Sequence, residues 1–213
     1  MMKNPTNEDW TKFYPDAILG EKEFRRHDTD FRDFFNTIYR YVPSDSSLLE
    51  IGTGPGKLLT VASLVNKYDI IATDVNKDLL KAAEMNVNKF GNPDKVEFRI
   101  LDTFKLLEDD YLKDKKFGAI IHHGLVEHFE DMDDVKKMIN IQSQRADYVI
   151  FGLPYFSKKN RGYWDSGDHK VYRNKWLYDQ WEEYLVRTFN PEEVFYFDSK
   201  ADNIMCVVKG DRS

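Results

Sequence analysis

Cysteine is nearly absent from the sequence, since Cys206 is the only one among 213 residues. A lone cysteine excludes an internal disulfide and any zinc site built from clustered cysteines. Cys206 lies within the apolar, strand-like run 204–208, which favours a buried, unreactive thiol over a nucleophile. The sequence therefore points away from disulfide-stabilised folds and from cysteine chemistry.

Long hydrophobic runs and a basic leader are also missing. The longest apolar run, 148–156, is far too short to cross a bilayer. Residues 1–9 are polar and include acidic side chains, unlike the basic stretch and apolar core of a secretory signal. We therefore expect a cytoplasmic protein that makes no membrane contact.

Positive charge is in deficit, because 31 Lys and Arg stand against 37 Asp and Glu and leave a formal net charge of −6. This balance disfavours sequence-independent binding to a phosphate backbone, so a nucleic-acid partner is not expected. Internal repeats and low-complexity tracts are lacking as well. With 41% hydrophobic and 15% aromatic residues, the chain can bury one sizeable core but is short for two independent domains.

What the sequence does contain is a regular alternation of short apolar runs with longer amphipathic stretches. The short runs lie at 48–51, 70–73, 96–101, 118–122, 148–152, 194–197 and 204–208. Helical patterns are found near 57–67, 77–89, 132–145 and 174–187. Such an alternation indicates crossover units that build a parallel sheet with helices on both faces.

The last two apolar runs are separated only by the turn-forming residues 198–203, which predicts an antiparallel hairpin at the end of the chain. The expected fold is therefore α/β: a doubly wound, mostly parallel seven-stranded sheet with a C-terminal antiparallel hairpin. We expect this domain to span 48–213. Residues 1–47 are predicted to form a helical cap segment, because their large apolar residues recur near helical spacing until Pro43.

A glycine-rich turn follows the first apolar run, with Gly52, Gly54 and Gly56 at every second position. Glycine admits positive φ and lets a ligand approach the backbone closely, although a structural tight turn would also explain it. In doubly wound sheets, ligands bind beyond the carboxyl ends of the strands. The spacing is not the GxGxxG of dinucleotide sites, and Glu50 at the strand end would repel phosphates but attract an ammonium group. The turn therefore favours a cationic, phosphate-free ligand.

Carboxylates also stand at the ends of the next two apolar runs. Asp74 ends the second run, where it can accept hydrogen bonds from both hydroxyls of a ribose. Asp102 follows the third run, where it can accept one from an adenine amino group. Each aspartate alone is more often a helix cap or turn residue. Together with the glycine turn they indicate a ligand that contains adenosine.

With these motifs the sequence resembles the class I S-adenosylmethionine-dependent methyltransferases, in register over about 48–152 and plausibly to the terminal hairpin. The resemblance implies a Rossmann-like fold, S-adenosyl-L-methionine as cofactor, and membership of the small-molecule branch, whose helix-entry sequence resembles 124–129. The cofactor-binding residues that it implies are Glu50, Gly52, Thr53, Gly54, Gly56, Asp74, Val75, Asp102, Thr103 and His122.

His122 and His123 straddle the end of the fourth apolar run. Strand alternation sends one of them toward the ligand and the other away, and the sequence does not say which. Methyl transfer relies mainly on proximity and needs a general base only when the acceptor arrives protonated. Both histidines are therefore candidate catalytic residues. No metal site is expected, because His123 and His128 lack the i, i+4 spacing that would place them on one helix face.

An aromatic and basic stretch, 155–181, follows the fifth run, and we interpret it as a substrate-side insertion that overhangs the cofactor cleft. The alternative is that Trp176 and Trp181 begin an amphipathic helix and the lysines are solvated. By family resemblance, an N-terminal helix also closes over the cofactor. The candidate substrate residues are Tyr14, Tyr155, Tyr163, Trp164 and His169.

The leading hypothesis is methyl transfer to an N or O atom of a small-molecule acceptor. RNA or protein methylation is an alternative, since basic residues interleaved with aromatic ones also bind single-stranded RNA. A non-catalytic scaffold that keeps the cofactor site is another, because fold does not fix function. The missing GxGxxG argues against a nicotinamide oxidoreductase.

Overall fold

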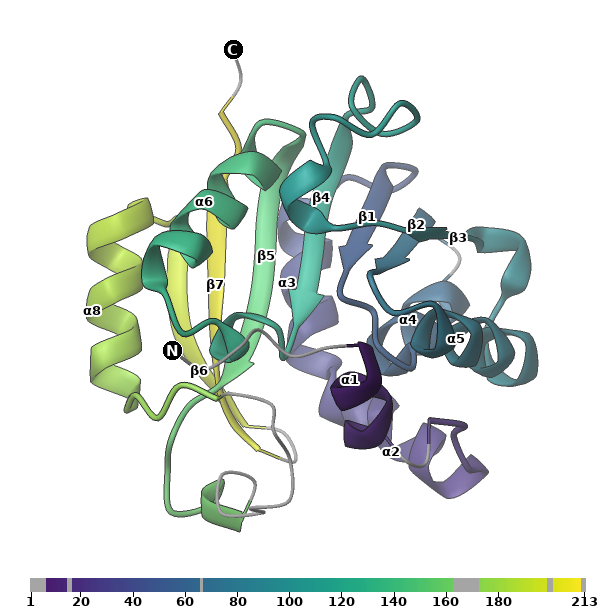
Figure 1. The fold of residues 1–213 in the computed structure, drawn as a ribbon, viewed down its shortest axis with the longest axis horizontal. Coiled ribbons are helices and arrows are strands. Elements are labelled where there is room, and N and C mark those ends of the chain that lie inside the picture. The colour runs from purple at the N-terminus through teal and green to yellow at the C-terminus, as the bar shows by residue number, and fades with distance from the viewer. Residues whose placement is uncertain (1–6, 15–16, 66, 163–172, 199–200, 212–213) are drawn as a thin grey trace.

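The computed structural model describes residues 7–14, 17–65, 67–162, 173–198 and 201–211. At its centre is a seven-stranded sheet in the order β3-β2-β1-β4-β5-β7-β6 (Figure 1). The strands are β1 (Ser47–Ile51), β2 (Asp69–Asp74), β3 (Val96–Ile100), β4 (Phe117–His123), β5 (Ala146–Pro154), β6 (Glu193–Asp198) and β7 (Asp202–Lys209). Strands β1 to β5 pair in parallel, whereas β7 is antiparallel to both β5 and β6. The predicted fold is confirmed, including its terminal hairpin.

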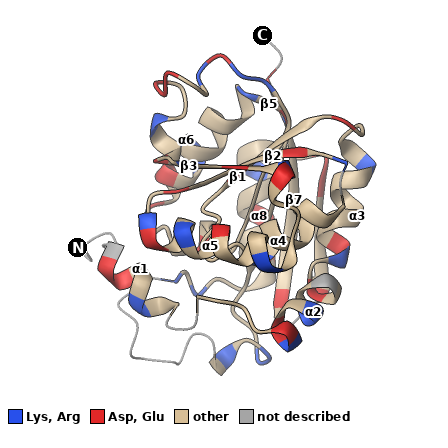
Figure 2. Ribbon diagram, turned by 90° about the vertical axis from the view of Figure 1, so that its right-hand side faces the viewer, with Lys and Arg blue, Asp and Glu red and all other residues tan. Residues whose placement is uncertain are grey.

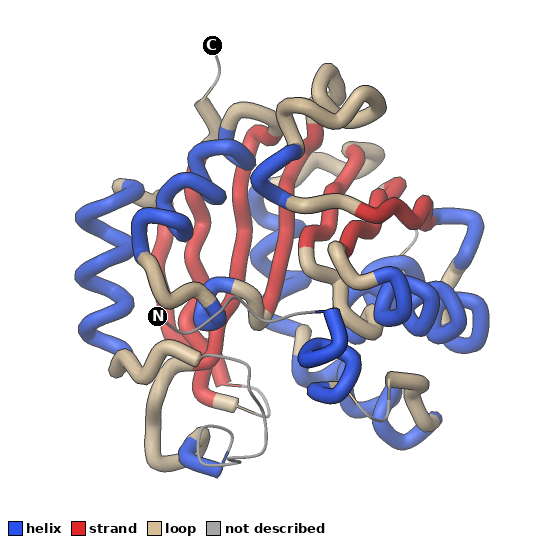
Figure 3. Tube along the Cα trace, viewed as in Figure 1, coloured by secondary structure: helices blue, strands red, loops and turns tan. Residues whose placement is uncertain are grey.

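Helices cover both faces of this sheet (Figure 3). They are α1 (Asn7–Phe13), α2 (Glu21–Asp30), α3 (Arg32–Tyr41), α4 (Lys57–Leu64), α5 (Lys77–Phe90), α6 (Met132–Ser143) and α8 (Tyr178–Phe189), with short 3-10 helices η1 (Pro93–Lys95), η2 (Thr103–Lys105) and η3 (Val126–His128). Buried side chains of α3, α4 and α5 pack on one face, and those of α6 and α8 on the other. Strands buried on both faces explain the continuous apolar runs of the sequence.

One helix begins later than its sequence pattern predicts. The pattern suggested a start at 174, but α8 begins at Tyr178. The side chain of Asn174 accepts a hydrogen bond from the Trp176 amide, and Leu177 is extended, with φ −74° and ψ 169°. The Gln180 side chain then accepts a hydrogen bond from the Leu177 amide, at 3.0 Å, and so caps the helix.

The lone cysteine is buried, as the sequence predicts. Cys206 lies fully buried on β7, where burial raises the pKa of its thiol above the ordinary range. Within the part of the chain that the structure describes, no helix combines the length and apolarity needed to span a bilayer.

The strand register brings the candidate ligand-binding residues to one edge of the sheet. Ile51 pairs with Thr73, Asp74 pairs with Ile100, and His123 pairs with Gly152. The parallel strands therefore end at a common level, and the loops that follow them meet above it.

Candidate cofactor and acceptor site

The turn after β1 consists of glycines in the left-handed region, with φ of 65° at Gly52, 53° at Gly54 and 76° at Gly56. Side chains are strained in this region, which only glycine enters readily. At Gly56 there is also no room, because a Cβ would lie 2.8 Å from the Cβ of Ala83 on α5. Gly56 thus lets α4 begin close against α5. A Cβ on Gly52 would lie 3.2 Å from the Leu125 side chain, and one on Gly54 would lie 3.8 Å from the Tyr14 ring.

Two cavities adjoin at this turn, a larger one of about 600 Å³ and a smaller one of about 220 Å³. Tyr14, Gly52, Gly54 and Gly124 line both of them. Both lie beyond the carboxyl ends of the parallel strands, which is where doubly wound sheets bind ligands.

The smaller cavity is lined by two aspartates, Asp74 at the end of β2 and Asp102 just after β3. Asp74 is 7% exposed, and its carboxylate accepts hydrogen bonds from the amides of Gly54 and Asn76, each at 2.8 Å. Burial raises the pKa of Asp74, and these amides oppose the rise. A carboxylate has about four acceptor positions, so Asp74 can accept further hydrogen bonds from a ligand.

The other side chains of the smaller cavity suit a flat apolar group with a polar edge. Asp102 is exposed, and its carboxylate caps η2 by accepting a hydrogen bond from the Phe104 amide at 3.0 Å. The lining residues around it are mainly apolar. They include Ile51, Leu79, Leu101, Phe104, Leu125 and Phe129, together with the predicted residues Val75 and Thr103.

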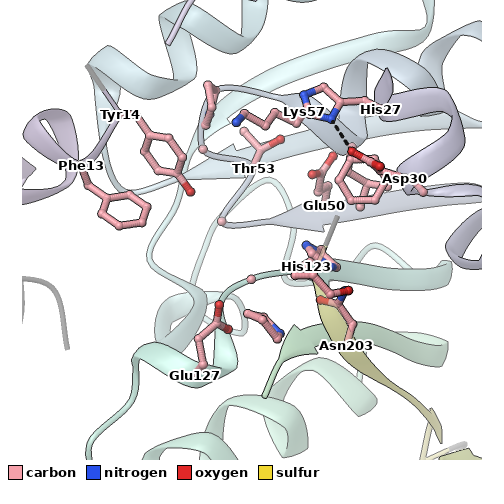
Figure 4. A pocket seen from close by; sticks show the side chains of 18 of the residues that line it. Phe13, Tyr14, His27, Asp30, Glu50, Thr53, Lys57, His123, Glu127 and Asn203 are labelled. Atoms are coloured by element: carbon pink, nitrogen blue, oxygen red, sulfur yellow. Dashed lines mark hydrogen bonds and ion pairs between the residues drawn. The ribbon is translucent and has the colours of Figure 1, made fainter. Parts of the chain in front are cut away.

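Glu50, near the end of β1, lines the larger cavity (Figure 4). Its side chain is buried, at 3% exposed, and among the described residues its Oε2 atom has no hydrogen-bond partner. Burial raises the pKa of Glu50 to about 8; the Thr53 hydroxyl opposes this rise and the charge of Asp74 adds to it. A buried carboxylate with an open acceptor position is suited to bind a cation.

The two histidines of β4 point to opposite faces of the sheet, as alternation requires. His123 lines the larger cavity, close to Asn203 in Figure 4. His122 is fully buried instead, stacks on Phe151 at 5.0 Å between ring centroids, and lines neither cavity. This corrects the assignment of His122 to the cofactor and to catalysis. Burial lowers the pKa of His123 to about 4 and that of His122 to about 3, so both are neutral at pH 7.

The predicted substrate residues divide into three groups. Tyr14 borders both cavities, with ring atoms 3.8 Å from where a Cβ on Gly54 would lie. Tyr155 lies away from them, because its ring packs against Tyr178 and Tyr196 at centroid distances of 5.5 and 6.4 Å. The remaining candidates, Tyr163, Trp164 and His169, lie outside the described residues.

The family is decided by a match that covers most of the chain. A family model described as a methyltransferase domain matches residues 43–183, which contain the glycine turn, both aspartates and His123. The chain belongs to the class I S-adenosylmethionine-dependent methyltransferases. Its cofactor is therefore S-adenosyl-L-methionine, and its activity is methyl transfer.

Solved structures of other proteins share the fold of this methyltransferase at low sequence identity. The PH0226 protein of Pyrococcus horikoshii OT3 is 14% identical, with a TM-score of 0.69 over 95% of this chain and 99% of that one. Magnesium protoporphyrin IX methyltransferase of Synechocystis PCC 6803, with bound S-adenosylhomocysteine, is 14% identical, with a TM-score of 0.64 over 96% and 94%. The glycopeptide N-methyltransferase MtfA is 15% identical, with a TM-score of 0.62 over 87% and 90%. A comparison with curated protein sequences finds no significant match.

The residues of the methyltransferase site fit this cofactor chemically. S-adenosylmethionine contains an ammonium group, a ribose and an adenine but no phosphate. Glu50 offers an open buried acceptor for the first, Asp74 has spare acceptor positions for the second, and the smaller cavity has mainly apolar walls for the third. The left-handed glycines leave the backbone accessible between these groups.

Several residues that line the larger cavity were not predicted from the sequence. His27 and Asp30 come from the predicted cap segment, and their i, i+3 spacing on α2 puts them on one face. Asn203, the second residue of β7, pairs with Pro154 at the end of β5. Glu127 on η3 lies within the 124–129 stretch that resembles the family's helix-entry sequence, but that resemblance did not predict its complete burial.

Proposed function

We propose that this methyltransferase transfers the methyl group to an N or O atom of a small-molecule acceptor held in the larger cavity. The observation that supports this proposal is the cavity itself, about 600 Å³ in volume and continuous with the glycine turn. It is lined by aromatic side chains, by His123 and by buried amides. Concave sites with a few convergent polar groups are typical of small-molecule binding.

In this proposal the cofactor is held by the residues that its chemistry requires. Asp74 accepts hydrogen bonds from the ribose hydroxyls, and Glu50 pairs with the ammonium group. Val75, Asp102 and Thr103 flank the adenine in the smaller cavity, with Gly52, Thr53 and Gly54 along the connecting backbone. Gly56 supports the site indirectly, by its close packing on α5.

When bound, the cofactor supplies a sulfonium methyl group that is displaced in line and leaves a neutral thioether. The protein's own task is then to hold the acceptor aligned and to exclude water. Tyr14 stands where the two cavities meet and can close one side of the acceptor space. His123 is neutral and can accept a hydrogen bond from the acceptor, which orients it.

Charge supports a small acceptor over a nucleic acid. Each Lys or Arg that lines the larger cavity within the described residues is paired with a carboxylate: Arg26 with Asp30, Lys57 with Glu23, and Lys159 with Asp198. Figure 2 shows Lys and Arg interspersed with Asp and Glu rather than gathered in a track. A basic track is what a phosphate backbone requires. Among the similar structures, the names of two refer to methylation of a porphyrin and of a glycopeptide.

The test is a methyl-release assay with labelled S-adenosylmethionine. A panel of small amines, phenols and carboxylic acids is compared with total RNA and with a denatured protein extract as acceptors. We expect label to appear in a small-molecule product, and its transfer to RNA or protein alone would contradict the proposal. Binding of S-adenosylhomocysteine without turnover on any acceptor would favour a non-catalytic scaffold.

A further inference from the structure

Helix α2 contributes a histidine and a carboxylate to the larger cavity, on a different wall from His123 (Figure 4). His27 is 4% exposed, and Phe31 lies beside it and beside His123, at centroid distances of 5.9 and 5.2 Å. Asp30 follows one turn after His27, and the two side chains point toward one another. The sequence motifs and the cofactor site account for neither residue.

Both ring nitrogens of His27 face a carboxylate just beyond hydrogen-bond reach. Nδ1 lies 3.6 Å from Oδ2 of Asp30, and Nε2 lies 3.6 Å from Oε1 of Glu23. Neither nitrogen has a hydrogen-bond partner among the described residues. The imidazole is thus buried at the cavity with its proton-accepting capacity unused, and catalytic hydrogen bonds are often this long before substrate binds.

The neighbouring carboxylates make His27 better suited than His123 to take up a proton. An imidazolium that forms beside a carboxylate is stabilised by it, as in catalytic triads. His123 is surrounded instead by Phe31, Phe34 and Phe197 and by the neutral amide of Asn203. His123 can therefore orient an acceptor, but among the described residues no charged group acts on its ring to stabilise a proton there.

Burial, together with two nearby cations, keeps the His27 ring neutral before the reaction. Burial is the main cause that lowers the pKa of His27 below its usual 6.5, and Lys57 and Arg26 lower it further. Glu23 and Asp30 oppose this, and Glu50 lines the same cavity from β1. At neutral pH the ring is uncharged, which is the form that can accept a proton.

We propose that His27, oriented by Asp30, is the catalytic base that accepts the proton lost by the methyl acceptor. The inference rests on the proposed function, and it restricts the acceptor to one with an N–H or O–H group at the reacting atom. As the new bond to the methyl carbon forms, the acceptor's proton moves to the His27 ring. The electron pair of the broken carbon–sulfur bond stays on sulfur, so atoms and charge balance.

The first arm of the test separates His27 from the cofactor site. In H27Q, the affinity for S-adenosylhomocysteine, measured by isothermal titration calorimetry, is expected to stay within about twofold of the wild type. A tenfold loss would place His27 in the cofactor site and overturn the proposal. Retained binding also shows that H27Q is folded.

The second arm follows turnover against pH, with an acceptor identified in the panel assay. H27Q is expected to lower kcat by about 100-fold and to remove the acidic limb of the profile. D30N shifts that limb to lower pH, because it removes a charge that favours the protonated ring. The matched control D33N, an exposed carboxylate on α3, leaves the profile unchanged. Full turnover and an intact acidic limb in H27Q would overturn the proposal.

A third measurement tests the His27–Asp30 pair independently of turnover. The imidazole pKa of His27 is measured by NMR in the wild type and in D30N, without any acceptor. A lower pKa in D30N supports the coupled pair, and an unchanged pKa overturns it. If the wild type methylates no small molecule at all, the proposed function fails, whereas turnover that H27Q leaves unaffected defeats the role of His27 alone.

Discussion

At the scale of single residues, the buried carboxylates Glu50 and Asp74 differ in their hydrogen-bond partners. Asp74 accepts two backbone amides at 2.8 Å, whereas Oε2 of Glu50 has no partner among the described residues. Hydrogen bonds to an ionised carboxylate favour its charged form, and burial without them favours the neutral form. Asp74 is therefore suited to accept hydrogen bonds from hydroxyls. The charged form of Glu50, in contrast, is stabilised when a cation binds beside it.

Asp74→Ala is expected to weaken binding of S-adenosylhomocysteine by more than tenfold. The substitution removes charge-assisted hydrogen bonds that contribute roughly 1.5–3 kcal/mol. Isothermal titration calorimetry measures the change, with D69A as control, because Asp69 lies at the other end of β2 with its side chain 79% exposed. An unchanged dissociation constant in D74A would refute the ribose assignment.

The raised pKa of Glu50 predicts that cofactor binding releases a proton. Its pKa of about 8 leaves the carboxyl mostly protonated at pH 7, and a bound ammonium group requires the ionised form. Binding at pH 7 should therefore release about one proton, seen as a dependence of the calorimetric enthalpy on buffer ionisation heat. E50Q should abolish this dependence and weaken binding. A buffer-independent enthalpy in the wild type would contradict the assignment.

The raised pKa of Glu50 also predicts the direction of a stability change. The folded state binds more protons than the unfolded state between the ordinary pKa of 4.5 and the folded value of about 8. The contribution of Glu50 to stability is thus fully present below pH 4.5 and is lost as pH rises toward 8. Urea denaturation should show E50Q less sensitive than the wild type to a rise in pH across this window.

At the scale of the elements, strand β4 decides the roles of its two histidines. Alternation sends His123 to the larger cavity and His122 into the core against Phe151. H122Q should lower the free energy of unfolding by about 2 kcal/mol more than H123Q, because His122 is fully buried. H123Q should instead reduce turnover. Urea denaturation and methyl-release assays on both variants provide the comparison, and equal stability losses would contradict it.

The predicted cap segment contributes side chains from its helices to the wall of the larger cavity. From α1 and the residue after it, Phe13 and Tyr14 line the larger cavity, while α2 supplies His27, Asp30 and the packing of Phe31. The side chain of Asn76 donates a hydrogen bond to the Thr11 hydroxyl at 3.2 Å, which ties α1 to the end of β2. The cavities are therefore closed partly by elements that precede the sheet.

At the scale of the whole molecule, the choice of cofactor is set by charge. The carboxylates of Glu50 and Asp74 stand beside the glycine turn, where a dinucleotide would place its pyrophosphate. S-adenosylhomocysteine at 100 times its dissociation constant should stabilise the protein by about 2.7 kcal/mol and raise Tm by roughly 5–10 °C. NADH should give no shift in the same thermal denaturation experiment. Stabilisation by NADH alone would contradict the account.

The strands of the sheet could be predicted from the sequence because each one is marked by a short run of neighbouring apolar residues. Buried strands appear as continuous apolar runs, and each of the seven runs became a strand with ends displaced by at most two residues. Glu50, Asp74 and Asp102 could be found because each lies within two residues of the carboxyl end of a strand. They needed no knowledge of how distant segments pack.

The acceptor side could not be predicted in the same way, because distant segments build it. His27, His123 and Asn203 come from α2, β4 and β7, and no local spacing links them. The choice between His122 and His123 required the strand's orientation, which alternation alone leaves open. Tyr155 lies away from the cavity because its ring packs against Tyr178 of α8 and Tyr196 of β6, two elements distant from it in the sequence.

A crystal structure with bound S-adenosylhomocysteine tests the central claim most directly. The account predicts the ribose hydroxyls on Asp74, the ammonium group on Glu50, and the sulfur facing the larger cavity between Tyr14 and His123. A ribose bound away from Asp74, or a sulfur that opens away from the larger cavity, would contradict it.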